Sequence, residues 1–138
     1  MSRDFRSIVG SAIGAASPRF ERFDATLTSG ETHDVNADRF EVEGMPAASR
    51  NEARLAGEAY RRAAYEIIPA VANTRVEIVL GDVAIALMRT AYRSFARGRS
   101  HSNANQAYAL ADRWDEFNER ARERVEFLHS RRKRSRSR

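Results

Sequence analysis

Six of the last eight residues are cationic, and they are the densest group of side chains in the sequence with a defined chemistry. They are Arg131, Arg132, Lys133, Arg134, Arg136 and Arg138. Because such a run repels itself and is unable to build an apolar core, it stays solvated and binds phosphate or carboxylate groups. The sequence therefore predicts a basic C-terminal tail over residues 131–138 that contacts nucleic acid or an acidic protein surface.

A second cationic group lies near the middle of the chain. It consists of Arg89, Arg93, Arg97 and Arg99. The first three are spaced four residues apart and share one side of a helix, with Tyr92 and Phe95 nearby. This group is a candidate for binding phosphate. The alternative is a solvated helix face whose arginines form ion pairs with neighbouring carboxylates.

The distribution of charge separates the tail from the rest of the chain. The protein carries 24 basic and 19 acidic side chains, a formal net charge of +5. Without the six tail cations, residues 1–130 hold 18 basic and 19 acidic side chains, a net charge of −1. The sequence thus predicts a near-neutral body that ends in a concentrated positive charge.

The residue types that usually perform catalysis or bind metals occur in no recognisable arrangement. Cysteine is absent, which excludes disulfides, thiolate metal sites and cysteine nucleophiles. The histidines, His33, His101 and His129, lack the spacing of metal-binding or Glu-x-x-His motifs. Nucleophile-elbow, P-loop and dinucleotide-binding glycine motifs are also missing. We expect a protein that is not an enzyme and that needs neither a metal nor a cofactor.

Length and hydropathy limit the architecture that positions these groups. A chain of 138 residues suits one domain plus tails. Its apolar runs are too short to span a membrane, and its N-terminus lacks the pattern of a classical secretion signal. We expect a cytoplasmic or virion protein. The predicted fold is mainly α: a small bundle of about three substantial helices with an N-terminal helical arm, a small β-hairpin or extended arm, and the basic tail.

Two helices of the predicted body are marked by capping boxes. Ser49 and Glu52 have the S-x-x-E spacing that begins a helix over 49–68. Thr74 and Glu77 repeat that spacing at the start of a helix over 74–97. Residues 75–80 also alternate between apolar and polar, so a short strand followed by a turn is the alternative there.

The last predicted helix covers 104–130 and has the strongest periodicity. Its apolar residues recur every three or four positions, at Ala107, Leu110, Trp114, Phe117, Ala121, Val125 and Leu128. This spacing is typical of a bundle or coiled-coil face and leaves the oligomeric state open. We expect Trp114 to anchor the core. If Trp114 is exposed instead, the stripe is an intersubunit face.

The N-terminal third combines a short helix with a strand-like segment. Residues 3–16 have helical apolar spacing, and we predict subunit contacts at Phe5, Ile8, Val9 and Ile13. Packing of this arm on its own domain and binding to a membrane surface are alternatives. Residues 19–44 show period-two alternation with a Ser29-Gly30 turn signal, which predicts a β-hairpin or extended arm.

The predicted organisation is an arm over 1–18, a β-hairpin or extended arm over 19–48, a helical body over 49–130 and the tail. This layout favours a structural subunit of a large assembly or nucleoprotein particle, such as a portal–tail ring protein of a virion. Its partners would be further copies or other subunits, with nucleic acid or an acidic protein at the tail. The alternative is a small nucleic-acid-binding regulator that presents Asn103, Asn105 and Gln106 at the start of its last helix.

Overall fold

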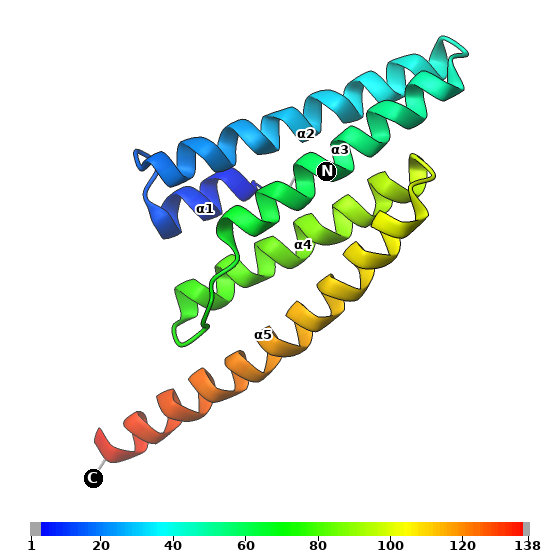
Figure 1. Cartoon of the computed structure of the whole chain (residues 1–138). Coiled ribbons are helices and arrows are strands. Elements are labelled where there is room, and N and C mark those ends of the chain that lie inside the picture. Colours follow the sequence, from blue (N-terminus) through cyan, green and yellow to red (C-terminus); the bar gives the residue numbers. More distant parts are fainter. Residues whose placement is uncertain (1–3, 137–138) are drawn as a thin grey trace.

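The computed structural model describes residues 4–136, and this part of the chain forms five α-helices and no strand (Figure 1). They are α1 (Phe5–Ile13), α2 (Pro18–Val42), α3 (Pro46–Ile67), α4 (Arg75–Arg97) and α5 (His101–Arg136). The mainly α class predicted from the sequence is confirmed. The predicted number of substantial helices is wrong. The structure has four long helices and one short helix, where three substantial helices were predicted.

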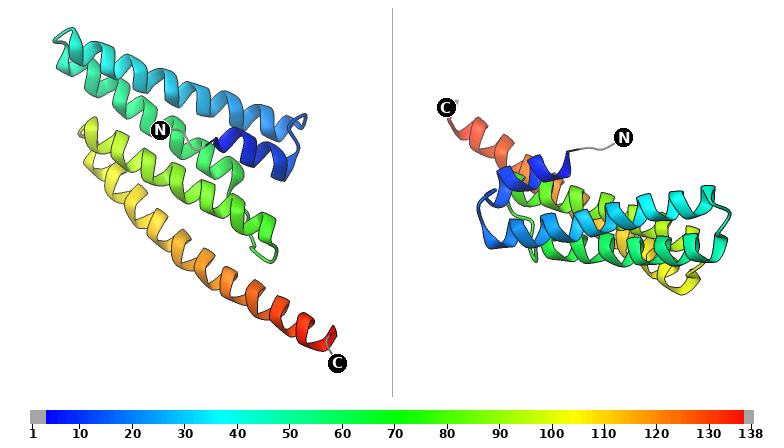
Figure 2. Two further views of the ribbon diagram at one scale, coloured as in Figure 1. Left: turned by 180° about the vertical axis from the view of Figure 1, so that it is seen from behind. Right: turned by 90° about the horizontal axis from the view of Figure 1, so that it is seen from above.

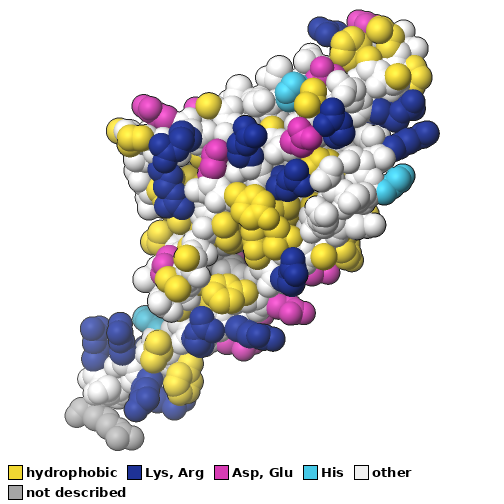
Figure 3. Space-filling view, viewed as in Figure 1, with side chains coloured by type: hydrophobic (Ala, Val, Ile, Leu, Met, Phe, Trp, Pro, Cys, Tyr) yellow, Lys and Arg dark blue, Asp and Glu magenta, His cyan; other side chains and the backbone are white. Residues whose placement is uncertain are grey.

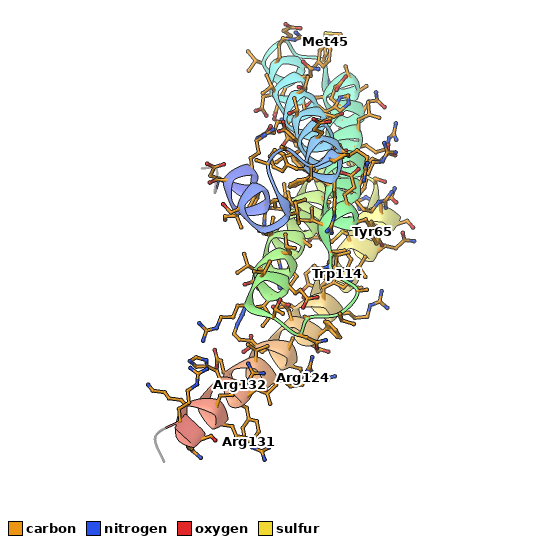
Figure 4. All side chains as sticks on the ribbon, turned by 90° about the vertical axis from the view of Figure 1, so that its left-hand side faces the viewer. Met45, Tyr65, Trp114, Arg124, Arg131 and Arg132 are labelled. Carbon is orange, nitrogen blue, oxygen red and sulfur yellow. The ribbon has the colours of Figure 1, made fainter. Side chains whose placement is uncertain are left out.

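The four long helices form an open layer. Helices that follow one another in the chain pack side by side, α2 on α3, α3 on α4 and α4 on α5, and each runs antiparallel to the one before it (Figures 1 and 2). The short helix α1 packs on α2 and α4 and covers one face of this layer. The opposite face carries Tyr65 and Trp114, as the side view in Figure 4 shows. The two edges of the layer are α2 and α5.

A glycine marks each of the three contacts between long helices. Each one accommodates a larger side chain from the following helix. The pairs are Gly30 with Tyr60, Gly57 with Phe95, and Gly81 with Asn118. A Cβ atom at these glycines would lie only 2.6 to 2.8 Å from the nearest atom of that side chain. The axes therefore approach closely because the chain has no side chain at these points.

The core lies along α3 and α4. Phe23, Ile67, Leu87, Met88 and Phe95 are among the largest fully buried side chains. Helix α4 contributes the most buried residues, because it has α3 on one side, α5 on the other and α1 across one face. This central position fits its wide apolar surface.

The predicted β-hairpin or extended arm over 19–48 is wrong. Residues 18–42 form α2, which Ser17 caps by accepting a hydrogen bond from the Phe20 amide and which has Pro18 in its first turn. Its buried positions, among them Phe23 and Leu27, follow helical spacing. The Ser29-Gly30 pair is not a turn but the middle of this helix, where Gly30 admits the ring of a tyrosine from α3.

One predicted capping box is wrong and the other is confirmed. Helix α3 begins at Pro46, so Ser49 lies inside it, and its hydroxyl donates to the Ala37 carbonyl of α2 at 2.8 Å. At the start of α4, the Thr74 hydroxyl accepts a hydrogen bond from the Glu77 amide at 3.2 Å. The continuous helix over Arg75–Arg97 excludes the alternative strand at 75–80.

Helix α5 is longer at both ends than the predicted helix over 104–130. A tight turn at Gly98–Ser100, with Arg99 at a φ of 57°, replaces the polar loop, and the helix starts at His101. At the other end it continues through Arg136. The predicted separate tail is therefore helical over 131–136, while Arg138 lies outside the described residues. Glycine and proline are absent from this helix, and cations are favourable at its C-terminus.

Candidate interaction site on helix α5

The C-terminal part of α5 projects beyond the rest of the molecule (Figure 1). Val125 packs against a small cluster formed by Ala72, Ile78 and Ala121. Every residue from 126 to 136 is exposed. We call residues 126–136 the α5 arm. At a rise of 1.5 Å per residue, the arm extends about 16 Å from the last contact with the layer.

The arm displays its cations in all directions around the helix axis. The described cations of the predicted tail are Arg131, Arg132, Lys133, Arg134 and Arg136. Consecutive residues of a helix are rotated by about 100°. The four consecutive cations from 131 to 134 therefore point to four different sides of the arm. Figure 3 shows Lys and Arg side chains gathered at this end of the molecule.

The part of α5 that packs on the layer, before residue 126, carries further arginines that were not predicted as site residues from the sequence. Arg113, Arg120 and Arg124 are exposed, and their spacing places them on one side of the helix together with Phe117 and Arg131. Most acidic residues of α5 lie on another side. They are Asp112, Asp115, Glu119, Glu123 and Glu126, while a sixth, Glu116, lies at the border of the arginine side. The signal that could have revealed this stripe is the seven- and four-residue spacing of the arginines.

A group of aromatic side chains lies on the face of the layer opposite α1. We call Tyr65, Trp114 and Phe117 the aromatic patch. The rings of Tyr65 and Trp114 meet edge to face, with centroids 5.5 Å apart, and point toward each other in Figure 4. Tyr65 is 54% exposed and Phe117 46%, whereas Trp114 is half-buried. Figure 3 shows hydrophobic side chains gathered in the middle of this face.

The aromatic patch borders a small open cavity of about 200 Å³. Its walls come from the α3–α4 connection and from α5, and they include Ile68, Pro69, Trp114 and Phe117. The expectation that Trp114 anchors a core is met only in part, because its ring packs on the core cluster and also borders this cavity. The apolar stripe of α5 is thus divided between the core and solvent.

The second predicted cationic group is partly occupied by ion pairs within the chain. Arg97 contacts Asp38 at 2.7 Å and Glu41 at 2.6 Å, which ties α4 to α2. Burial disfavours the charged form of Arg97, but these hydrogen bonds outweigh it and raise its pKa. Arg89 contacts Asp115 of α5 at 3.1 Å. For these two arginines, the alternative of ion pairing describes the structure.

The other two members of that group are placed differently. Arg93 is exposed and donates a hydrogen bond to the Thr90 hydroxyl at 3.3 Å. Arg99 is exposed in the turn between α4 and α5. The structure therefore does not gather the four arginines around a common point, and phosphate binding by Arg93 or Arg99 stays a prediction.

The predicted subunit contacts of the N-terminal segment pack on the chain's own core. Val9 is fully buried, and Phe5, Ile8 and Ile13 are half-buried against the same core cluster. Arg6 fastens α1 to α2 through Asp24 and Glu31. Its hydrogen bond to Glu31 is the main reason why its pKa is raised. For Val9 the alternative of packing on its own domain holds, and contact of a neighbour with the other three stays a prediction.

The start of α5 holds the three polar residues considered for base recognition, and one of them makes hydrogen bonds within the chain. Asn103 accepts a hydrogen bond from Arg61 of α3 at 2.9 Å and donates one to Ser100. Asn105 and Gln106 are exposed. Because α4 and α5 run antiparallel side by side, this end of α5 lacks the crossed arrangement of a helix-turn-helix.

Neither a metal-binding cluster nor a membrane-spanning helix occurs among the described residues. Among residues 4–136, no group of three or more His, Cys, Asp or Glu side chains is arranged to hold a metal ion. None of the helices described there is both long and apolar enough to cross a membrane. In comparisons with known proteins, no family model, curated protein or solved structure matches the chain.

Proposed function

We propose that the protein is a non-enzymatic structural subunit of a larger assembly or nucleoprotein particle. The helical layer is the body of the subunit, and the α5 arm reaches a partner outside it. The observation that carries this proposal is the arm itself, which continues α5 as a helix for about 16 Å while every residue of it is exposed. An arm of this kind has no role in packing its own domain.

The composition of the neighbouring surface supports contacts with other subunits. Trp, Tyr, Phe and Arg are enriched in protein interfaces and supply most of their binding energy. The aromatic patch and the exposed Arg113 and Arg120 place these residue types near one another along α5. A virion component such as a portal–tail ring protein is the assembly that this layout fits by architectural analogy.

Sedimentation velocity of the full-length chain over a range of concentrations tests this proposal. We expect species well above the 15.6 kDa monomer. Replacement of Tyr65 and Phe117 by Ser should shift the equilibrium toward the monomer. Val42→Ser is the matched control, because Val42 is 88% exposed at the far end of α2. A wild-type chain that stays monomeric at every concentration contradicts a self-assembling subunit.

A small nucleic-acid-binding regulator is the second candidate, and the charge of the α5 arm favours it. A regulator of this kind is a monomer or dimer in solution and recognises bases through polar side chains. The arm offers few such side chains, since Ser130 and Ser135 are its main neutral hydrogen-bonding groups. The sedimentation experiment separates the two candidates by the size of the particle.

A further inference from the structure

We infer that the α5 arm binds duplex DNA by lying as a helix in the major groove, with phosphates on both sides of it. This inference deepens the proposed function by naming the partner of the arm, and it rests on that proposal for the role of the arm. The evidence is the distribution of charge around the arm, the size of the arm and its lack of successive aromatic residues, each of which narrows the class of partner.

The first argument is the distribution of charge around the arm. The cations at 131, 132, 133 and 134 occupy four sides of the helix axis. A flat acidic protein surface or a bilayer contacts only one side of a helix and leaves the other cations without a counter-charge. A groove of a nucleic acid duplex has phosphates along both walls. The all-round charge therefore favours a partner that presents phosphates on more than one side of the helix.

The second argument is size. A helix with its side chains is about 10–12 Å in diameter, and the major groove of B-form DNA is about 12 Å wide. The arm is about 16 Å long, and duplex DNA carries one phosphate per about 1.7 Å of axis. The duplex along the arm thus presents roughly nine phosphates to the five described cations, Arg131, Arg132, Lys133, Arg134 and Arg136.

The third argument excludes single-stranded nucleic acid as the partner and limits which residues of the arm contact the duplex. Proteins bind single strands through successive aromatic side chains on which bases stack, whereas the described arm has aromatic rings at Phe127 and His129 and none over 130–136. Glu123 and Glu126 are exposed at the base of the arm and repel phosphate. The contact therefore begins near residue 127. Because the cations of the arm are directed at phosphates on both walls of the groove, we expect binding to depend little on sequence.

A salt titration of binding to a short labelled DNA duplex measures how many cations meet phosphates. With six tail cations, the wild-type chain should give a slope of log K against log salt of about −5. Replacement of Arg131, Arg132 and Arg134 by Gln should make the slope shallower by about 3. A triple variant with an unchanged slope places the contact elsewhere and overturns the inference.

The matched control removes the same amount of charge from the body. Arg22 and Arg39 are exposed on α2 and Arg62 is exposed on α3, away from the arm. Their replacement by Gln should leave the slope at the wild-type value. If this control loses as much of the slope as the arm variant, binding follows the total charge of the protein and not the arm.

A helix-breaking variant separates groove binding from the action of a flexible polycation. Ser130→Pro keeps all six cations but interrupts the helix at the base of the cationic run. Ser130→Ala is the control that preserves the helix. We expect Ser130→Pro to bind duplex DNA more weakly than Ser130→Ala at the same salt concentration. Equal affinities would overturn the insertion of a helix.

Comparison of DNA with RNA identifies the groove. The major groove of an RNA duplex is deep and too narrow for side chains to enter. The wild-type chain should therefore prefer a DNA duplex to an RNA duplex of the same sequence, and Ser130→Pro should lose this preference. A wild-type chain that binds both equally contradicts a site in the major groove.

The failure of this inference is distinguishable from the failure of the proposed function. Sedimentation without nucleic acid reports assembly, and the salt titration reports the arm. A chain that assembles but shows no salt-dependent binding to duplex DNA refutes the DNA partner and keeps the structural role. A chain that binds DNA through the arm but stays monomeric refutes the structural role and keeps the DNA partner.

Discussion

Replacement of Gly57 by Ala tests how closely α3 and α4 pack. In the interior of a helix, Ala is normally more stable than Gly by about 0.5–1 kcal/mol. At Gly57, however, the new Cβ would lie 2.7 Å from one ring atom of Phe95 and 2.9 Å from two others. Carbon atoms in favourable contact are about 3.5–4.0 Å apart. The ring or the helix must therefore move.

Movement of the ring is hindered on its other side. Phe95 is fully buried, and the guanidinium of Arg61 lies over its ring, 4.9 Å from the centroid. Overpacking of a filled core destabilises a protein by about 1–3 kcal/mol. Subtraction of the gain in helix propensity leaves a net loss of roughly 0–2 kcal/mol for Gly57→Ala.

Gly10→Ala is the matched control, because Gly10 also lies inside a helix. Its new Cβ would meet Ala15 and Phe20 at 3.5 Å, an ordinary contact. This variant should keep the gain in helix propensity, so Gly57→Ala should be less stable than Gly10→Ala by about 1–3 kcal/mol. Urea unfolding followed by circular dichroism measures both.

Two results would refute the reasoning. The first is a Gly57→Ala protein as stable as the Gly10→Ala protein. The second concerns the double variant Gly57→Ala/Phe95→Leu, in which a smaller side chain faces the new methyl group. Its loss of stability should be smaller than the sum of the two single losses, because the residues are in contact. Strict additivity would show that the methyl group and the ring do not compete for space.

Three further changes test other contacts. Trp114→Ala should lower stability by about 2–4 kcal/mol in urea unfolding, less than the loss of a fully buried Trp, because the ring is half-buried. Ser49→Ala should lower it by about 0.5–1.5 kcal/mol in thermal unfolding, since the hydrogen bond from Ser49 to the Ala37 carbonyl is lost. Deletion of residues 1–17 should lower the melting temperature, because Val9 is fully buried in the core. An unchanged melting temperature would restore the interpretation of this segment as an assembly arm.

The misassigned segment over 18–42 shows why the sequence was ambiguous there. Phe23 and Leu27 are four residues apart, a spacing that fits both the helical period of 3.6 and the strand period of two. Phe40 and Val42 suggested alternation, but Val42 is 88% exposed and shares no buried face with Phe40. The Ser17-Pro18 pair was the better signal, because it begins a helix.

The helices over 74–97 and 104–130 were predictable because their apolar faces repeat at helical spacing over many turns. The arrangement of these helices in space was not predictable from the sequence. The open layer depends on Gly30, Gly57 and Gly81, each of which fits a side chain from a helix distant in sequence. A glycine in isolation signals a turn as readily as a close contact. Only the tertiary structure reveals which of the two applies.

The candidate site was predictable in its charge and not in its shape. The run over 131–138 is evident from composition, but the mutual repulsion of its cations favoured an unstructured tail. Two effects oppose this repulsion: the C-terminus of a helix stabilises cations, and the chain has no helix breaker between His101 and Arg136. A third effect comes from the body of the protein, because α5 is already a helix where it leaves the layer.

The base of the arm is held by a polar junction that sets its direction. Asn118 is buried in α5 and donates to the Ile78 carbonyl at 3.0 Å and to Asp82 at 2.7 Å, both in α4. Arg122, one turn further, contacts Asp82 at 2.8 Å, and this hydrogen bond is the main reason why its pKa is raised. Rotation of α5 by one position would leave the Asn118 amide buried without partners. The charge of the arm and its orientation are therefore specified by different residues, because Asn118 and Arg122 hold α5 on α4 while the cations lie further along the helix.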